Sequence, residues 1–369
     1  MVIGAGGSIG SELCRQIIRL KPSKLLLVEL NEFALYNIYE ELRIYNNNLN
    51  IISLLVNAQN QSKLEKILET FKVDTIYHAA AYKHVPLVEE NICESIKNNV
   101  FGTFLISQIA IQHNVSNFVL ISSDKAVRST NIMGASKRLA EICIQALYHS
   151  DDKHTKFAIV RFGNVLQSSG SVIPKFKKQI KQGGPVTLTH PDVTRYFMTI
   201  IEASQLVIQA GAMSEGCEVF VLDMGKSVKI KDLIYKMIKL SGLTVRDSKN
   251  LEGDIGVKII GLRPGEKLYE ELLLGDNPQK TYHEKIQKAQ DPFIPFDQLK
   301  IDLDNLTALV QDNRAAEVKD MLHRLLPSYQ SNSKIVDLYY EEQLKNKNDL
   351  KTSPIFKNQE DKVIRIKTK

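Results

Sequence analysis

The chain has 369 residues, of which 43% are hydrophobic and 24% are charged, and its formal net charge is +6. This length and composition are typical of a soluble globular protein, with either two domains or one large α/β domain that carries a lobe. The positive excess is small and diffuse. It therefore suits an anionic small-molecule substrate and argues against a nucleic-acid partner.

The remaining bulk features point to a cytoplasmic protein without a metal. The four cysteines are far apart in the sequence and form no CxxC pair, so we expect buried thiols in a reducing compartment. The histidines show no ligand spacing, so no metal is expected. No apolar run reaches the roughly 18 residues of a membrane span, and no signal peptide is visible.

A glycine-rich turn lies at the start of the chain. In VIGAGGSIG, the residues Gly4, Gly7 and Gly10 are spaced three apart, between a short apolar strand and an amphipathic helix. Such glycines permit a tight turn, let backbone N–H groups approach a pyrophosphate, and let the helix pack closely on the strand. We expect this turn, with Ser8 and Ile9, to bind a dinucleotide.

An acidic residue follows at the end of the second predicted strand, KLLLVEL. Glu29 lies nineteen residues after Gly10, where a carboxylate accepts hydrogen bonds from ribose hydroxyls and repels a 2′-phosphate. Alone, Glu29 is equally well explained as an ordinary carboxylate at a strand end. Together with the glycines, it predicts that the cofactor is NAD rather than NADP.

Strands and helices then alternate in a way that predicts a Rossmann-type doubly wound parallel sheet, and hence an α/β fold. Strands are expected at 50–56, 75–79, 118–121 and 157–161, with helices at 62–71, 87–112 and 132–149. The predicted strand ends carry small or polar residues that suit a dinucleotide lying along the sheet edge: Asn57, Ala58, Ala79, Ala80, Ala81 and Ser122. Lys83 and His84 follow in the sequence and are candidate contacts of either the cofactor or the substrate. For His84, a structural role in a loop explains the sequence equally well.

The stretch FVLISSDKAVRSTNIMGASK carries the candidate catalytic residues. Its strand ends at Ser123, Asp124 and Lys125, while Met133 and Lys137 lie four residues apart on the following helix and so share a face. A hydroxyl, a carboxylate and two ammonium groups therefore converge on one crevice. Turn chemistry or a solvated surface would explain any one of these residues alone.

The second half of the chain predicts a smaller α/β lobe. A turn-rich basic segment follows residue 161, then helices and a strand. A Pro-Gly turn lies beside Glu266, which is a candidate substrate contact, and is expected to lead into a helix. Lys175, Arg195 and Arg263 are candidate contacts of a diphosphate, although solvated surface charge is the better explanation of any single lysine. We expect an NAD-binding domain at 1–165, to which 200–225 returns, a substrate-binding lobe at 166–330, and a charged mobile tail at 331–369.

Several motifs in order carry a resemblance to a known family. They are GAGGSIGSEL, YHAAAYKHVP, NNVFGT, SSDKAV, NIMGASKRLAE, RFGNV, GGPVTLTHPDVTRYFMTI, FVLDMG and LRPGEKLYEEL. Over about residues 2–275 the chain resembles UDP-N-acetylglucosamine 4,6-dehydratases, in the polysaccharide biosynthesis branch of the extended short-chain dehydrogenase/reductases.

The resemblance implies a dehydration that regenerates its cofactor. Hydride passes from C4 of the sugar to NAD, a base removes the C5 proton, an acid protonates the departing C6 hydroxyl, and hydride returns to C6. The product is a UDP-4-keto-6-deoxy-N-acetylhexosamine for surface polysaccharide. Homo-oligomers are common in the superfamily, and this expectation rests on analogy alone.

The resemblance also implies roles for individual residues. Ser123 is expected beside the C4 oxygen, Asp124 as general acid, Lys125 as general base and Lys137 at the nicotinamide ribose. Asn99 is expected to support the active-site helix and the cofactor. Contacts to the UDP-sugar are expected from Arg161, Asn164, Arg195 and Arg263.

The chain departs from the superfamily at three places. Met133 stands where a tyrosine usually acts as base, and a thioether cannot take a proton. We expect Ser123 and Lys137 to relay the C4 proton instead, and in the family methionine here goes with retention at C5.

Asn57 stands at the end of the third strand, where the family often has an aspartate. The first strand is reduced to Val2 and Ile3, so the chain is expected to be a fragment, to begin at a late start codon, or to be the soluble part of a membrane-anchored enzyme.

Two other functions remain open at this point. A nucleotide-sugar 4-epimerase shares the fold, the cofactor and the oxidation at C4, but it needs no acid and base at C5 and C6. A non-catalytic subunit that binds NAD or a UDP-sugar is favoured by Met133 and the short first strand. A dehydrogenase that releases NADH is the weakest alternative.

Overall fold

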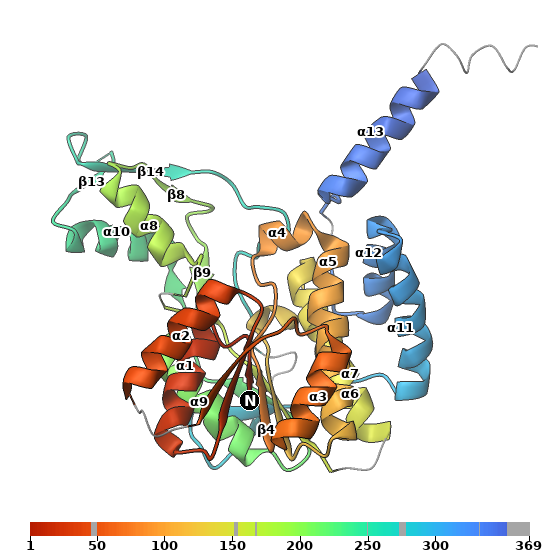
Figure 1. Cartoon of the computed structure of the whole chain (residues 1–369). Coiled ribbons are helices and arrows are strands. Elements are labelled where there is room, and N and C mark those ends of the chain that lie inside the picture. Colours follow the sequence, from red (N-terminus) through yellow and green to blue (C-terminus); the bar gives the residue numbers. More distant parts are fainter. Residues whose placement is uncertain are drawn as a thin grey trace, which may run out of the picture.

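Nine strands form one sheet at the centre of the structure (Figure 1). The computed structural model describes residues 1–352, except 46–49, 151–153, 167, 249, 273–277 and 332. The strand order is β15-β16-β11-β6-β5-β4-β1-β2-β3, and the seven strands from β11 to β3 are parallel. Their bounds are β1 (Val2–Ile3), β2 (Leu25–Glu29), β3 (Ile51–Leu55), β4 (Thr75–His78), β5 (Asn117–Ile121), β6 (Lys156–Arg161) and β11 (Cys217–Leu222).

The two residues of β1 lie at the centre of this sheet. Val2 pairs with Leu27 of β2 on one side and with Tyr77 of β4 on the other. Both residues of β1 are buried. The short first strand therefore still leads the chain into the glycine turn at the carboxyl edge of the sheet.

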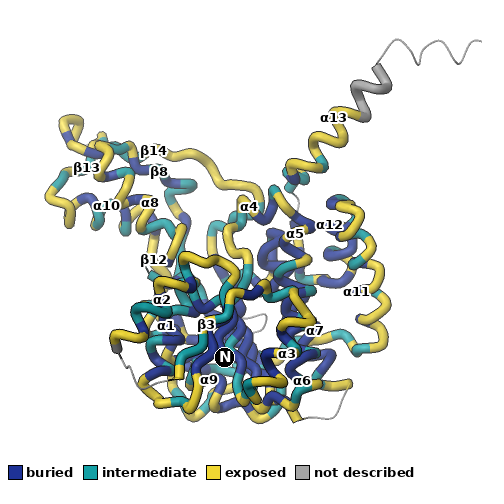
Figure 2. The backbone as a smooth tube through the Cα atoms, in the orientation of Figure 1, coloured by how far each residue is buried: buried dark blue, intermediate teal, exposed yellow. Residues whose placement is uncertain are grey.

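Helices cover both faces of the sheet, which confirms the predicted doubly wound fold (Figures 1 and 2). On one face lie α1 (Ser8–Ile17), α2 (Glu32–Tyr45) and α9 (Ile200–Met213); on the other lie α3 (Gln61–Phe71), α6 (Gly102–Gln112) and α7 (Ile132–Ser150). Helix α2 is an addition to the predicted elements. The expected helix 87–112 is divided into α4 (Val85–Glu89), α5 (Ile92–Ile96), a π-helical turn (Lys97–Phe101) and α6, because Asn91 leaves the helical region with φ −142° and ψ 61°.

A separate lobe contains α8 (Val172–Lys181), β8 (Val186–Leu188), α10 (Ile230–Leu240), β13 (Val245–Arg246) and β14 (Ile255–Ile259). The segment predicted to be turn-rich is thus helical. Its apolar residues Val172, Phe176 and Ile180 are spaced four apart, and Phe176 and Ile180 are buried in the lobe's own core. The lysines of α8 at 175, 177, 178 and 181 are exposed.

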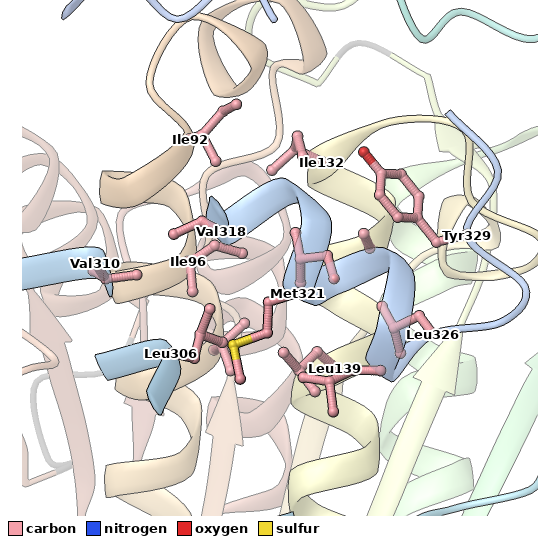
Figure 3. Close-up of a cluster of buried hydrophobic side chains, with 14 of the residues drawn as sticks. Ile92, Ile96, Ile132, Leu139, Leu306, Val310, Val318, Met321, Leu326 and Tyr329 are labelled. Atoms are coloured by element: carbon pink, nitrogen blue, oxygen red, sulfur yellow. The ribbon is translucent and has the colours of Figure 1, made fainter. Parts of the chain in front are cut away.

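The end of the predicted lobe belongs to the main domain instead. Strands β15 (Gln279–Lys280) and β16 (Ile286–Ala289) extend the central sheet in antiparallel orientation. Helices α11 (Phe296–Gln311) and α12 (Ala315–Leu325) pack against α5 and α7, where Leu306, Val318 and Leu139 meet in one apolar cluster (Figure 3). Apolar burial therefore places the boundary of the lobe before β15 rather than at residue 330.

The predicted mobile tail contains a helix, α13 (Leu338–Thr352), which projects away from the body of the structure (Figure 1). The rest of that tail, 353–369, lies outside the described residues. None of the helices within the described ranges combines the length and the apolar character needed to cross a membrane.

Arg161 is not a substrate contact in this structure, contrary to the prediction. Its side chain is fully buried at the end of β6 and forms ion pairs with Glu141 of α7 and Asp291. Glu141 also accepts hydrogen bonds from Ser122 Oγ at 2.6 Å and Arg138 at 2.9 Å. Burial acts to raise the pKa of Glu141, but the guanidiniums of Arg161 and Arg138 lower it to about 2. Arg161 thus belongs to a buried network that joins β5, β6 and α7.

We expect Glu141→Gln to destabilise the fold strongly, because it leaves two buried guanidiniums with one carboxylate. Removing one partner of a buried ion pair costs about 3–5 kcal/mol. The free energy of unfolding from urea denaturation measures this loss. A matched control is Glu40→Gln, since Glu40 pairs with Arg43 on the surface of α2 at 3.6 Å and an exposed pair contributes about 0–1 kcal/mol. Equal losses in the two variants would contradict a stabilising role for the buried network.

Candidate active site

A cavity of about 920 Å³ lies where the carboxyl edge of the sheet meets the lobe. Its walls come from the glycine turn, the loops after β4 and β5, the first turns of α7, the loop before α8, the lobe, and residues 263–270. Most of the predicted site residues line it: Gly7, Ser8, Ile9, Gly10, Ala79, Ala81, Lys83, His84, Ser122, Ser123, Lys125, Met133, Lys137, Asn164, Lys175, Arg195, Arg263 and Glu266. Those outside its lining are Gly4, Glu29, Asn57, Ala58, Ala80, Asn99, Asp124 and Arg161.

The glycine turn has no room for side chains at two of its three predicted positions. Gly4 has φ +81°, and a Cβ there would lie 2.7 Å from the backbone nitrogen of Ala80. A Cβ on Gly10 would lie 1.9 Å from the carbonyl oxygen of Gly4. The start of α1 therefore packs directly on the turn, and the residues of its first turn, whose N–H groups lack partners within the helix, line the cavity from Ser8 to Gly10. This cradle fits a dinucleotide pyrophosphate.

Glu29 is fixed beside that turn at the end of β2. One carboxylate oxygen accepts a hydrogen bond from the backbone N–H of Gly6 at 3.0 Å, and the other accepts from Leu30 and Asn31. Asn57, at the end of β3, is exposed and its side-chain oxygen accepts from the N–H of Gln59. The carboxylate is thus held at the position where the sequence predicts a ribose contact.

The predicted acid and base form a direct ion pair. Lys125 Nζ lies 2.9 Å from Asp124 Oδ1, and Ser123 Oγ donates to the same oxygen at 2.9 Å. Asp124 is buried, and its Oδ2 atom makes no hydrogen bond to the described residues. Asn164 Oδ1 accepts a long hydrogen bond of 3.5 Å from Lys125 Nζ. The catalytic turn therefore brings a hydroxyl, a carboxyl group and an amine within one hydrogen-bonded group.

A second carboxylate, Glu270, approaches the same lysine. Its Oε1 atom lies 3.7 Å from Lys125 Nζ and 3.6 Å from Arg195 Nε. Burial acts to lower the pKa of Lys125, but Asp124 and Glu270 outweigh it, so this pKa is raised. Glu270 lies in the segment LRPGEKLYEEL and is not among the residues predicted for the site. Nothing local marks this glutamate, because its partners come from segments far away in the sequence.

Met133 and Lys137 share one face of α7 toward the cavity, as their spacing predicts. Lys137 Nζ donates to the carbonyl oxygen of Ile121 at 2.9 Å, and burial lowers its pKa to about 8. Asn99 lies behind this helix. Its side chain bonds to both backbone groups of Tyr82 and donates to Ser136 Oγ on α7, which is the supporting position that was expected.

Arg195 in β9 (Thr194–Arg195) is held by the segment that follows the Pro-Gly turn. Its guanidinium donates to the carbonyl oxygens of Lys267 and Leu268 and lies 3.4 Å from Glu266 Oε1. Residues 263–272 form no helix, contrary to the prediction, because these carbonyl groups bond to Arg195 and Thr194 instead of to a helical turn. Tertiary hydrogen bonds have overridden local helix propensity.

Four more predicted residues surround the cavity mouth. Lys175 and Arg263 are exposed and lie near Glu266; burial, followed by Arg263, lowers the pKa of Lys175. Lys83 and His84 follow β4, and a Cβ on Gly170 would lie 2.3 Å from the His84 ring. His84 therefore packs on the loop before α8, which agrees with the structural alternative stated for it. In the described part of the chain, no three His, Cys, Asp or Glu side chains gather as metal ligands would.

Comparisons with known proteins relate this geometry to named relatives. Capsular polysaccharide biosynthesis protein CapD of Staphylococcus aureus is 52% identical over 293 residues, which are 79% of this chain and 47% of that protein. The chain thus spans about half the length of CapD. A UDP-N-acetylglucosamine 4,6-dehydratase (inverting) of Campylobacter jejuni is 29% identical (83% of this chain, 85% of that protein). A UDP-glucose 4-epimerase of Rickettsia massiliae is 30% identical (76% and 79%).

Solved structures show the same fold. Pen from Bacillus thuringiensis has a TM-score of 0.66 and 34% identity, covering 73% of this chain and 82% of its own. The dTDP-glucose 4,6-dehydratase DesIV of Streptomyces venezuelae, with NAD and TYD bound, has a TM-score of 0.62 and 20% identity, covering 76% and 92%. The family model for polysaccharide biosynthesis proteins matches residues 1–291. The chain therefore belongs to the polysaccharide biosynthesis protein family, in which nucleotide-sugar dehydratases and epimerases are its relatives.

Proposed function

We propose that this chain catalyses the NAD-dependent dehydration of UDP-N-acetylglucosamine to a UDP-4-keto-6-deoxy-N-acetylhexosamine, with retention at C5, for surface polysaccharide synthesis. The contact between Asp124 and Lys125 at the cavity carries this proposal. Elimination of water needs a base for the C5 proton and an acid for the C6 hydroxyl, and a 4-epimerase needs neither. The predicted cytoplasmic location and homo-oligomeric state stay predictions.

NAD is the cofactor that these residues fit. The close packing at Gly4 and Gly10 holds the start of α1 directly against the glycine turn, and Glu29 lies beside that turn. The NAD-bound DesIV structure has the same fold. The bound cofactor would supply reversible hydride transfer. Gly7, Ser8 and the start of α1 would hold its pyrophosphate, Glu29 its adenosine ribose and Lys137 its nicotinamide ribose.

The contact between Asp124 and Lys125 offers a way for both residues to reach the protonation states that the proposed reaction needs. A lysine is a base only when neutral, and a carboxyl group is an acid only when protonated, yet each charge stabilises the other. Moving one proton over the 2.9 Å from Lys125 Nζ to Asp124 Oδ1 produces both active forms at once, with no net change in charge. Lys125 can then take the C5 proton while Asp124 gives its proton to the C6 oxygen, which leaves as water. Exclusion of solvent by bound substrate would favour the neutral pair.

The C4 proton needs a different route because Met133 cannot accept it. Ser123 Oγ bonds to Asp124 and lies beside the cavity, and Lys137 has a pKa lowered to about 8 by burial. We assign the relay of this proton to Ser123 together with Lys137. Lys175, Arg195 and Arg263 remain the candidate contacts of the diphosphate; Arg161 does not, since it is fully buried.

Proton NMR of UDP-N-acetylglucosamine, incubated with the chain and NAD in D₂O, tests the proposed reaction. We expect a new C6 methyl signal and deuterium at C5, with no net reduction of the cofactor, and ring couplings that report retention. A galacto-configured product without a methyl signal would instead assign the 4-epimerase activity that the Rickettsia relative suggests. An unchanged spectrum from folded, NAD-bound protein would favour a binding subunit.

Two variants separate the proton transfers. Lys125→Met should stop loss of the C5 proton and allow oxidation at C4, so the near-ultraviolet absorbance of reduced cofactor should build up. Ser123→Ala should slow that absorbance change itself, by roughly the hundredfold or more typical of a proton-transfer group. Stopped-flow absorbance on both variants measures this. If Lys125→Met prevents cofactor reduction although substrate binds, Lys125 acts earlier than proposed.

Glu29→Gln should weaken NAD binding and reduce the preference for NAD over NADP. Loss of a charged hydrogen-bond partner costs about 1.5–3 kcal/mol, which corresponds to roughly tenfold or more in Kd. Calorimetric titration with each cofactor measures both constants. Glu32→Gln is the matched control, since it makes the same change of charge three residues away on the exposed first turn of α2. An unchanged preference in Glu29→Gln would remove Glu29 from the cofactor site.

A further inference from the structure

Glu270 is a buried carboxylate at the cavity that the proposed chemistry does not yet use. Only 4% of its side chain is exposed, it lines the cavity, and its Oε2 atom makes no hydrogen bond to the described residues. A buried ionised carboxylate is costly unless cations compensate it. Its compensating cations are Lys125 Nζ at 3.7 Å and Arg195 Nε at 3.6 Å.

These two cations come from different parts of the fold. Lys125 lies in the turn after β5 in the main domain, and Arg195 lies in β9 beside the lobe. Glu270 itself follows a loop that is docked on the main domain, where Thr130 and Asn131 donate to the carbonyl oxygen of Gly265. Glu270 Oε1 is therefore shared between a lysine of the main domain and an arginine beside the lobe, and Lys125 Nζ has carboxylates from two separate segments near it, Asp124 at 2.9 Å and Glu270 at 3.7 Å.

We propose that Glu270 is a positioning residue for Lys125: its carboxylate fixes the amine between two acids and stabilises the positive charge that Lys125 gains when it accepts a proton. This inference rests on the proposed function only for its effect on turnover. In that step the C5–H bond breaks, an Nζ–H bond forms on Lys125, and the electron pair left at C5 expels the C6 oxygen, which takes its proton from Asp124.

The charges around Lys125 support this role. The groups that face it are Asp124 in its own turn, Glu270 from the loop after β14, Arg195 from β9 and the neutral amide of Asn164. Lys267 adds a further positive charge near Glu270. Burial lowers the pKa of Lys125, and the two carboxylates raise it above its ordinary value. Burial also raises the pKa of Glu270, against the lowering effect of Lys125.

The structure offers a matched pair of variants. Glu270→Gln removes the charge that faces both Lys125 and Arg195. Glu266→Gln removes a carboxylate that contacts Arg195 at 3.4 Å and has no contact with Lys125 among the described ion pairs. Glu270→Asp keeps the charge on a shorter side chain. Thermal unfolding followed by circular dichroism is the control that checks whether each variant is folded.

The first readout does not depend on turnover. Competitive labelling of the folded chain with acetic anhydride over a pH series, followed by mass spectrometry, gives the titration of Lys125. We expect the midpoint to move to lower pH in Glu270→Gln, to stay near the wild-type value in Glu266→Gln, and to be largely restored in Glu270→Asp. An unmoved midpoint in Glu270→Gln, or equal movement in the two glutamine variants, would overturn the proposal.

The second readout is the rate of C5 deuterium incorporation at saturating substrate in the NMR assay. Because Glu270→Gln removes a charge that stabilises protonated Lys125, this rate should fall by roughly tenfold, less than the 10²–10⁴-fold expected for loss of a general base. Glu266→Gln should change KM without a comparable fall in this rate. If the wild type forms no dehydrated product, the proposed function fails while the labelling result still decides whether Glu270 controls Lys125.

Discussion

The buried carboxylate of Glu141 connects the elements that carry the site. It accepts hydrogen bonds from Ser122 at the end of β5, from Arg161 at the end of β6, and from Arg138 one turn earlier on its own helix. Ser122 directly precedes the catalytic turn, and the same helix presents Met133 and Lys137 to the cavity. A buried network of charge-assisted hydrogen bonds of this kind favours one arrangement of the two strands and the helix. The separation between the catalytic turn and Lys137 therefore depends on a group that never contacts substrate.

Two buried charge networks near the carboxyl ends of β5 and β6 each contain two cations and two carboxylates, and they differ in that one of them has a lysine in place of an arginine. The inner network contains Arg138 and Arg161 with Glu141 and Asp291. The outer network, at the cavity, contains Lys125 and Arg195 with Asp124 and Glu270. Guanidiniums do not lose their protons in proteins, so the inner network is locked in one charge state. The outer network includes a lysine, whose pKa responds to burial, and only there can a proton move between partners.

Much of this arrangement follows from local sequence. The parallel strands appear as short apolar runs, and their ends agree with the prediction to within one or two residues, because burial on both faces requires continuous apolar sequence. The local sequence does not predict helix α8, because glycines, serine and proline lie in and around it. Pro174 in its first turn is nevertheless compatible with a helix. The pairing of Asp124 with Lys125 was predictable because the two residues are adjacent. The burial of Arg161 was not, since Asp291 lies 130 residues away in the sequence.

The position of residues 263–270 at the cavity depends on contacts with distant segments, which no local sequence pattern predicts. Gly265 has φ +72°, and a Cβ there would lie 2.6 Å from the Cβ of Asn131, so only glycine allows the loop to approach the start of α7 this closely. Lys267 Nζ then donates to the carbonyl oxygen of Val127, directly after the catalytic turn. These two contacts bring Glu270 to Lys125. The proposed acid and base are thus neighbours in sequence. The carboxylate of Glu270, which lies near the proposed base, comes instead from a loop whose docking depends on the backbone conformation of a single glycine.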